Sequence, residues 1–282
     1  MTTIDLSGAA DLHCHFGPDA HRERSVDALE AAREAAAAGH AALVLKSHDY
    51  PTAALARIVG QVVPGIRVFG GISCDREVGG VNPSAVETAL RLGAKVVWLP
   101  TLSSRQDFEI GVAARLGIPG PGLRVVDDSG RLLPETHEVM RLVEESGAIL
   151  ATGHVSRAEH FAVARKFRGK LLVTHAMEEL AGPNLAIADC VALADLGATI
   201  ELCALTSIGA LATRPVSDLA ACIRTVGPRR VTLASDYGQK VNPHPAEGLR
   251  IFAAALHEAG VSERDIRQMA CDNPCRLLGL SR

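Results

Sequence analysis

The sequence has few aromatic residues, no long hydrophobic run and no closely paired cysteines. Phe, Trp and Tyr make up only 3% of the 282 residues, so a core must be built mainly from Ala, Val, Leu and Ile. No apolar stretch reaches the ~18 residues that a membrane-spanning helix needs, and the first residues lack the pattern of a secretory signal. The seven Cys include no C-x-x-C pair, which predicts free thiols in a cytoplasmic protein rather than a disulfide framework.

An excess of basic residues is also missing. With 29 Lys and Arg against 32 Asp and Glu, the formal net charge is -3. Proteins that bind nucleic acid or a membrane surface carry a basic patch or stripe, and nothing in the sequence resembles one. The predicted partner is therefore a small-molecule substrate, with no nucleic acid and no membrane.

Short apolar runs alternate with helical patterns along the whole chain. The predicted strands span residues 9–15, 41–46, 66–73, 95–100, 148–154, 170–175, 199–203 and 230–236. The predicted helices span residues 25–38, 51–62, 83–92, 135–146, 157–167, 184–196, 215–226 and 245–259. Regular alternation predicts a parallel sheet, and eight units predict one (β/α)8 TIM barrel covering residues 1–282. An open doubly wound sheet usually carries a G-x-G-x-x-G loop after its first strand, whereas this strand ends in DLHCHFGPD.

An insertion of residues 102–134 separates the fourth strand from its helix. It contains GIPGPG and a hairpin-like stretch, LRVVDDSGRLLPE, with a turn at Asp128, Ser129 and Gly130. Because it follows a strand, it lies at the face where barrel sites are built. A lid, a substrate contact, a dimer contact and a plain insertion all fit it. Barrel enzymes with an insertion of this size often pair, so a homo-oligomer is expected.

Residues that bind metals recur at the ends of the predicted strands. His13 and His15 lie two apart, so both imidazoles face one side of the first strand. His154, His175 and Asp236 end the fifth, sixth and eighth strands. A barrel brings these ends together, and buried polar groups need a compensating partner. The pattern predicts a divalent metal site, which imidazoles with one carboxylate make suitable for Zn²⁺ and compatible with Mn²⁺, Fe²⁺ or Ni²⁺.

The motifs DLHCHFGPD, TGHVS, THAM and ASDYG resemble, in this order, those of the amidohydrolase superfamily. The C-terminal CDNPCRLLGL is similar to the N-P-A-x-x-L-G-L segment that closes many of these enzymes. The resemblance implies a distorted barrel, one or two divalent metals and hydrolysis of amide, ester or phosphoester bonds. It also implies that His13 and His15 are metal ligands and that Asp236 is both ligand and general base. His154 and His175 would then bind a second ion or support the first.

The fourth strand departs from the family's pattern. Members with two metals carry a Lys or Glu there that bridges the ions, but this strand reads AKVVWLPT, with Trp98 and Pro100 at its end and Lys95 at its start. Lys46 and His48, at the end of the second strand, offer a substitute. Lys46 could be a carbamylated bridge, an anchor for a substrate anion, a Schiff-base lysine or a solvated rim residue. His48 could bind substrate or serve as a further ligand.

Other polar residues have less definite predicted roles. Glu201, in the apolar seventh strand, needs a partner, and it could support a histidine, bind substrate or form a salt bridge within the barrel. Lys46, Arg105 and Lys240 are expected at the barrel mouth, which favours an anionic or carbonyl-rich substrate. Five histidines in or beside predicted helices are interpreted as surface groups: His21, His40, His137, His160 and His257.

The predicted activity is metal-dependent hydrolysis of an amide-type bond, including cyclic amides, or an ester bond of a small molecule. Asp236 would take a proton from the attacking water and pass it to the leaving group, while His175 or Lys46 would stabilise the developing oxyanion. Three alternatives remain open from the sequence: a metal-dependent decarboxylase or lyase, a metal-free Schiff-base enzyme using Lys46, and a non-catalytic binding barrel.

Overall fold

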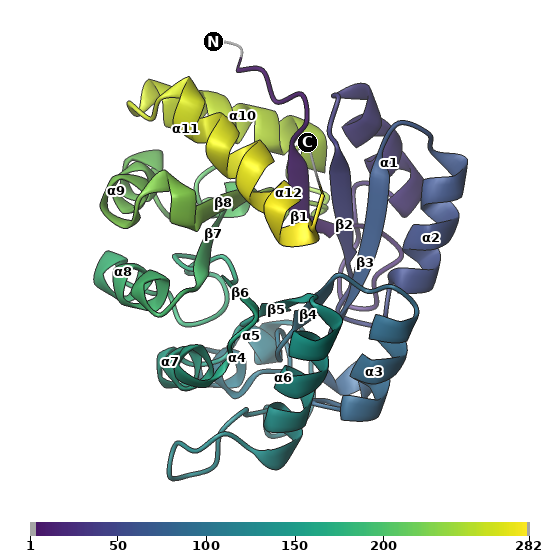
Figure 1. Ribbon diagram of the computed structural model, residues 1–282, viewed down its shortest axis with the longest axis vertical. Coiled ribbons are helices and arrows are strands. Elements are labelled where there is room, and N and C mark those ends of the chain that lie inside the picture. Colours follow the sequence, from purple (N-terminus) through teal and green to yellow (C-terminus); the bar gives the residue numbers. More distant parts are fainter. Residues whose placement is uncertain (1–3, 281–282) are drawn as a thin grey trace.

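The computed structural model describes residues 4–280, which form a barrel of parallel strands surrounded by helices (Figure 1). Eight strands follow each other in sequence order around one sheet. They are β1 (Ala10–His15), β2 (Ala42–Lys46), β3 (Arg67–Ser73), β4 (Val96–Trp98), β5 (Ile149–Ala151), β6 (Lys170–Val173), β7 (Thr199–Cys203) and β8 (Val231–Ala234). The predicted (β/α)8 barrel is confirmed.

Helices connect successive strands and pack around the outside of the barrel. They are α1 (Ala28–Ala37), α2 (Ala53–Val62), α3 (Pro83–Arg91), α4 (Arg105–Glu109), α5 (Val112–Arg115), α6 (Pro134–Ser146), α7 (Arg157–Lys166), α8 (Ile187–Asp195), α9 (Val216–Val226), α10 (Pro245–Glu258), α11 (Glu263–Arg267) and α12 (Asn273–Leu278). Short helical turns are η1 (Arg76–Val78), η2 (Ala204–Thr206), η3 (Pro228–Arg230) and η4 (Gln268–Asp272).

Some helices begin later than predicted, among them α1 and α8. α1 starts behind Asp27, which forms a capping box with Glu30, rather than at Ser25. α8 starts at Ile187 rather than at Asn184, and Asn184 has a positive φ of 47° that no helix contains.

Several strands end earlier than predicted, and this affects the site. β5 ends at Ala151, β6 at Val173 and β8 at Ala234. The histidines and the aspartate expected on these strands therefore lie two or three positions further on, in the turns. The chain leaves the ladder there because these segments pair with side chains and with neighbouring turns.

The two ends of the sheet meet beyond the last residue of β8. The backbone amide of Asp236 donates to the carbonyl of His13 at 2.9 Å, and the amide of His15 donates to the carbonyl of Tyr237 at 2.8 Å. This closure joins the ends of the chain's first and last strands, so residues more than 220 positions apart become neighbours.

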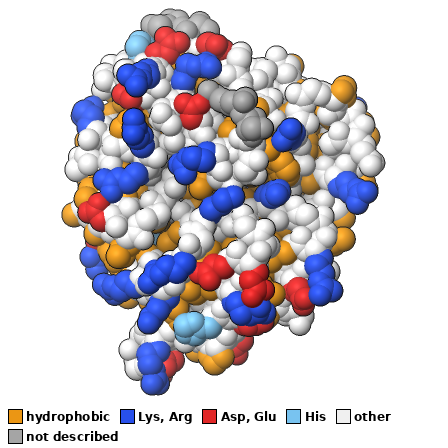
Figure 2. Space-filling view, viewed as in Figure 1, with side chains coloured by type: hydrophobic (Ala, Val, Ile, Leu, Met, Phe, Trp, Pro, Cys, Tyr) orange, Lys and Arg blue, Asp and Glu red, His pale blue; other side chains and the backbone are white. Residues whose placement is uncertain are grey.

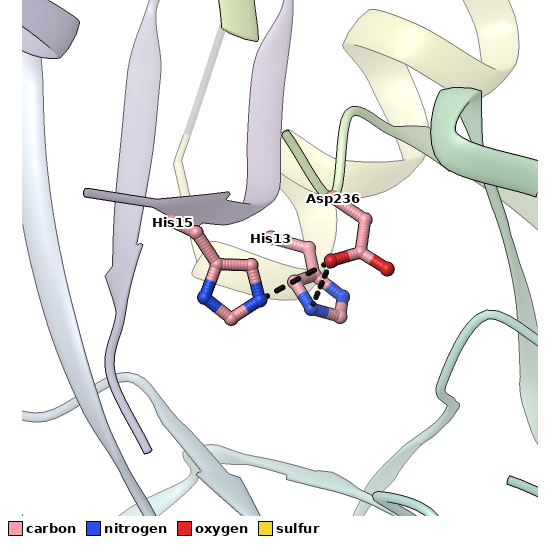
Figure 3. A group of neighbouring side chains, drawn as sticks. All are labelled: His13, His15 and Asp236. Atoms are coloured by element: carbon pink, nitrogen blue, oxygen red, sulfur yellow. Dashed lines mark ion pairs between the residues drawn. The ribbon is translucent and has the colours of Figure 1, made fainter. Parts of the chain in front are cut away.

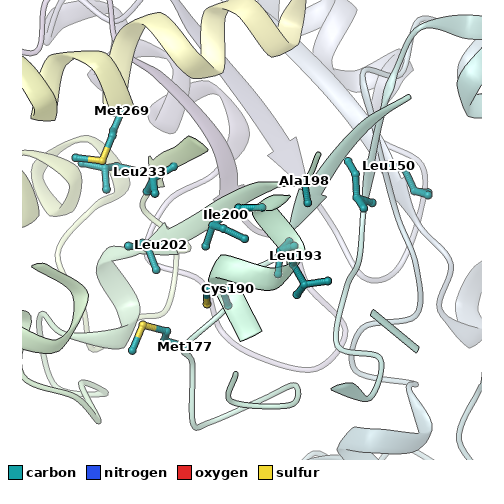
Figure 4. Close-up of a cluster of buried hydrophobic side chains, with 14 of the residues drawn as sticks. Leu150, Met177, Cys190, Leu193, Ala198, Ile200, Leu202, Leu233 and Met269 are labelled. Carbon is teal, nitrogen blue, oxygen red and sulfur yellow. The ribbon is translucent and has the colours of Figure 1, made fainter. Parts of the chain in front are cut away.

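Hydrophobic side chains fill the molecule in two layers. Inside the barrel, Leu12, Val44 and Trp98 belong to a cluster that α12 covers through Leu277 and Leu278; α12 lies in front of the strands in Figure 1. Between sheet and helices, a larger cluster follows β5 to β8. Figure 4 shows part of it, with side chains from α8 packed against those of β7.

The interpretation of five histidines as surface groups is wrong for two of them. His40 is 3% exposed and His160 is fully buried. His160 occupies the inner face of α7, where its Nδ1 lies 3.0 Å from the carbonyl of Ser156. Burial lowers the pKa of each imidazole to about 4, so both are neutral core residues.

The insertion contains more regular structure than the sequence indicates. It begins with α4 and α5 and ends in the predicted hairpin, where Val126 pairs antiparallel with Leu132. A small hydrophobic cluster of Leu102, Val112, Ala113 and Ile118 holds the two helices together. The insertion is therefore an ordered part of the barrel mouth.

One face of the molecule shows how its charged side chains are distributed. On the described part of the face in Figure 2, Lys and Arg side chains are dispersed among acidic and uncharged ones instead of forming a continuous stripe. No helix within residues 4–280 is both long and apolar enough to cross a membrane.

Candidate metal centre and active site

A bulge in β1 directs both of its histidines into the barrel. The pairing of β1 with β2 shifts register between Asp11 and Cys14. Before the shift, Leu12 packs inside the barrel, and after it Cys14 packs outside, against α1. The neighbours Leu12 and His13 therefore both face inward, which strict alternation would forbid. The bulge thus allows one strand to fill the barrel with Leu12 and to offer two imidazoles above it.

His13, His15 and Asp236 form what we term the first cluster (Figure 3). The Nε2 atoms of His13 and His15 each lie 3.2 Å from Asp236 Oδ1. One potential ligand atom from each residue lies within 4.8 Å of the others. The closure of the sheet holds Asp236 in place, and its positive φ of 52° marks a backbone conformation that side-chain-bearing residues seldom adopt outside functional sites.

Glu201 orients the imidazole of His13 in the first cluster. Its Oε2 lies 2.9 Å from Nδ1 of His13 and accepts a hydrogen bond from the backbone amide of His175 at 3.1 Å. With Nδ1–H donated to this carboxylate, the lone pair of His13 sits on Nε2 and points at Asp236. Glu201 does not line the cavity. Of its three predicted roles, the geometry fits the support of a histidine.

His48, His154 and His175 form the second cluster, on the other side of the barrel mouth. The Nε2 atoms of His154 and His175 lie 2.9 Å apart. Nδ1 of His154 lies 2.6 Å from Asp107 of the insertion, so its Nε2 also carries the lone pair. His175 has a positive φ of 23°, which directs its ring out of the turn and toward His154.

His48 joins the two clusters. Its ring stacks on that of His15 with the centroids 4.9 Å apart, and it lies edge-on to His154 at 6.4 Å. Its Nδ1 lies 2.7 Å from the hydroxyl of Thr101, which in turn donates to Asp75. Three of the five imidazoles are therefore oriented by a carboxylate, directly or through a hydroxyl.

Lys46 is buried between the clusters. It is 1% exposed, pairs in register with His15 and places Nζ 5.6 Å from the ring centre of Trp98. Burial lowers its pKa, while Asp236, Asp75 and Glu201 act in the opposite direction. The solvated-rim interpretation of Lys46 is wrong, because the side chain lies inside the protein and faces the cavity.

Burial sets the protonation states of the site. It lowers the pKa of His13, His15 and His175 well below the usual value, so these imidazoles are neutral, which is the form that binds metals. It raises the pKa of Asp236 well above its usual range and that of Glu201 to about 7. Buried carboxyl groups of this kind become ionised only beside positive charge.

The donor set fits a divalent metal ion at the first cluster. Nε2 of His13 is fully buried and has no hydrogen-bond partner among the described residues, although such atoms are normally satisfied. It lies near the imidazole of His15 and the carboxylate of Asp236, and a cation among these three groups would be stabilised by all of them. Two imidazoles and a carboxylate, with one imidazole oriented by a further carboxylate, are a typical ligand set for catalytic zinc.

The clusters open into a cavity of about 220 Å³ at the carboxyl ends of the strands. Among the predicted site residues it is lined by His15, Lys46, His48, His154, His175 and Asp236. Arg105 and Lys240, which were expected at the mouth, do not line it. They pair instead with Glu109 and Glu23 on the surface.

Several site residues were not predicted from the sequence. Asp75 follows a strand in GGISCD, so the signal that identified Asp236 was present for it as well. Asp107 lies in the insertion without any strand signal. The remaining ones line the cavity from loops and from the end of α5: Arg22, Arg24, Arg115, Glu178 and Gln239.

The fold is a TIM barrel of the kind seen in solved amidohydrolase and dipeptidase structures. The structure is similar to an amidohydrolase from Pseudomonas aeruginosa, with a TM-score of 0.63 at 15% identity over 96% of this chain and 95% of the other. It is also similar to a probable dipeptidase from the same organism, with a TM-score of 0.68 at 13% identity over 96% and 94%. An N-acetyl-D-glucosamine-6-phosphate deacetylase from Mycobacterium smegmatis gives 0.56 at 15% over 96% and 76%.

The chain belongs to a family of unknown function, DUF6282, whose sequence model matches residues 8–201. No curated protein matches the chain significantly. At these low identities the similar structures establish the fold, and the chemistry has to be argued from the site itself.

Proposed function

We propose that the protein is a metal-dependent hydrolase that cleaves an amide-type C–N bond, including that of a cyclic amide, or an ester bond of a small molecule. The observation that carries the proposal is the first cluster, in which three ligand atoms converge within 4.8 Å beside a cavity of small-molecule size. The similar amidohydrolase and peptidase structures support it, because the same fold carries hydrolytic sites at this end of the barrel.

His13, His15 and Asp236 would hold the ion, and Zn²⁺ suits them best, with Mn²⁺, Fe²⁺ and Ni²⁺ as alternatives. A bound divalent ion supplies Lewis acidity, activating a water and polarising the scissile carbonyl. The second cluster offers imidazole nitrogens for a second ion. Trp98 occupies the inward position at the end of β4, so that strand supplies no group to bridge two ions. Lys46 is the cavity residue of the same chemical type as a bridging lysine.

The side chains that face the cavity would carry out proton transfer and charge stabilisation. Asp236 has one oxygen between the two imidazoles, and its other oxygen is available to take a proton from the attacking water and deliver it to the leaving nitrogen or oxygen. Nζ of Lys46 is placed to stabilise negative charge that develops on the carbonyl oxygen. Glu201 keeps His13 in the correct tautomer throughout.

The proposal is tested by incubating the purified protein with N-acyl amino acids, dipeptides, cyclic amides and lactones in ¹⁸O-labelled water. Hydrolysis transfers one ¹⁸O atom from water into the carboxylate product, whereas the organic product of a lyase or decarboxylase gains none in the bond cleavage. Chelation should abolish turnover and added metal should restore it. The control variant Asp195→Asn, which loses only an exposed ion pair with Arg230, should respond to chelation and metal as the parent does. Turnover that survives chelation, or trapping of a keto substrate on Lys46 by borohydride, would refute the proposal.

A further inference from the structure

The cavity is lined by more cationic side chains than carboxylates. Four cations line it, together with two carboxylates, Glu178 and Asp236. The cations are Lys46, Arg22, Arg24 and Arg115. Apolar side chains complete the lining, among them Leu102, Val112 and Leu180.

Both carboxylates already have other partners. Asp236 belongs to the first cluster, and Glu178 accepts hydrogen bonds from the amides of Glu179 and Leu180 and from the hydroxyl of Thr206. They therefore leave the arginines unneutralised. Of the three arginines, Arg24 alone is paired, through two hydrogen bonds to Asp19.

Arg22 and Arg115 form no ion pair with any Asp or Glu among residues 4–280. Both side chains are partly exposed to solvent, and both line the cavity. Burial, Arg24 and Arg115 lower the pKa of Arg22, while the carboxylates of Asp236 and Asp19 raise it. The three guanidinium groups are therefore close enough to act on one another, and an anion bound among them would reduce the repulsion between these like charges.

The structure holds Arg22 in place through its loop. Oδ1 of Asp19 accepts hydrogen bonds from the amides of His21 and Arg22 at 2.8 and 2.9 Å. Two positions further on, Arg24 pairs its backbone with that of Gln239 after β8. The loop that carries Arg22 is thus held by hydrogen bonds within it and by its pairing with the segment that follows β8.

Arg115 reaches the cavity from the insertion. It is the last residue of α5, whose Val112 and Ala113 are buried in the small cluster with Leu102 and Ile118. Val112 itself lines the cavity. Two separately anchored elements therefore present guanidinium groups to the same space.

We propose that Arg22 and Arg115 together bind an oxyanion of the substrate, a carboxylate or a phosphate, so that the substrate is an acidic small molecule. A guanidinium group offers paired donors that match the two oxygens of such a group. The anion lies beside the two arginines while the scissile bond lies at the first cluster, so the insertion contributes to substrate binding through Arg115. The inference deepens the proposed hydrolase function and rests on it.

Binding is measured by calorimetry on the purified, metal-containing protein with succinate, inorganic phosphate and uncharged succinamide as probes. We expect succinate or phosphate to bind and succinamide not to bind, and the stronger of the two anions identifies the acidic group. Arg22→Gln and Arg115→Gln should each weaken binding by about ten- to a hundredfold, the loss of a charged hydrogen bond. Arg105→Gln, in the same insertion but paired with Glu109 on the surface, should bind like the parent.

The His13→Ala/His15→Ala variant separates this inference from the proposed function. Anion binding should survive there within about threefold, since the arginines are untouched, even if the protein proves to have no metal and no hydrolase activity. Three results would overturn the inference: no binding of either anion by the parent, binding unchanged in both arginine variants of a folded protein, or binding that disappears with the histidines alone.

Discussion

The two histidine clusters face the same cavity, but different kinds of structure hold them. In the first, His13 and His15 belong to a strand, and Asp236 is fixed by backbone hydrogen bonds to that strand. In the second, His154 and His175 lie in turns beyond β5 and β6, and Asp107 of the insertion orients His154. The first cluster is therefore held by the closure of the barrel itself, whereas the second depends on turns and on the insertion.

The largest effect is expected from Asp236→Asn. The amide keeps the shape of the side chain but cannot take a proton from water, so turnover should fall by about 10²–10⁴-fold. Steady-state kinetics and metal analysis on the same sample would show this as a loss of kcat with part of the metal retained. Unchanged turnover would refute the role of Asp236 as the group that takes the proton from water.

Glu201→Gln and Asp107→Asn compare the supports of the two clusters directly. Each should lower metal affinity or activity by about 10- to 100-fold, the usual effect of a carboxylate behind a ligand histidine. Glu201→Gln should weaken the metal site of the first cluster, and Asp107→Asn should leave that site intact. Competitive metal titration with a chromogenic chelator distinguishes them, and equal loss in both variants would show that the clusters act as one unit.

Backbone strain offers a second comparison, because a glycine lies beside each cluster. A Cβ at Gly238 would clash with the backbone of His15, and one at Gly153 with the carbonyls of Leu99 and Pro100. Both substitutions by Ala should lower stability by about 1–3 kcal/mol, measured by chemical denaturation. Gly130 also has a positive φ, of 78°, but a Cβ there would meet no atom within 4 Å, so Gly130→Ala should cost less. A loss as large as the other two would mean that crowding at the clusters is not the cause.

The smallest effect is expected from Ser104→Ala. Ser104 caps α4 by accepting from the amide of Asp107 at 3.0 Å, so its loss should cost about 0.5–2 kcal/mol of stability and lower activity slightly through Asp107. Ser262→Ala removes the same kind of cap from α11, far from the cavity. Equal losses of stability with a difference in activity would support the role of α4, and identical activities would contradict it.

The sequence predicted the fold, and it pointed to the residues of the candidate site, because both inferences follow from short-range patterns. Eight apolar runs with helices between them leave few topologies, and His13, His154 and Asp236 each follow such a run. The bulge in β1 could not be predicted, since alternation gives His13 and His15 one face without indicating that Leu12 shares it. The bulge is a consequence of pairing with β2, which is a long-range contact.

The supporting residues were missed for a related reason. Asp107 lies 47 positions from His154 and carries no local signal. Arg22 comes from a loop and Arg115 from a short helix of the insertion, and the positions of both depend on contacts with distant segments. Glu201 was recognised as a buried acid in need of a partner, but only the fold identifies that partner as His13. Pairings between distant elements were thus the part of the site that local patterns could not supply.

The central claim is that His13, His15 and Asp236 bind a divalent metal ion. Its most direct test is elemental analysis of protein purified without chelator, beside the His13→Ala/His15→Ala variant with its folding verified by circular dichroism. The account predicts one or two equivalents of metal in the parent and loss of at least one in the variant. A parent without metal, even after incubation with Zn²⁺ or Mn²⁺, or a variant with the full metal content of the parent, would contradict it.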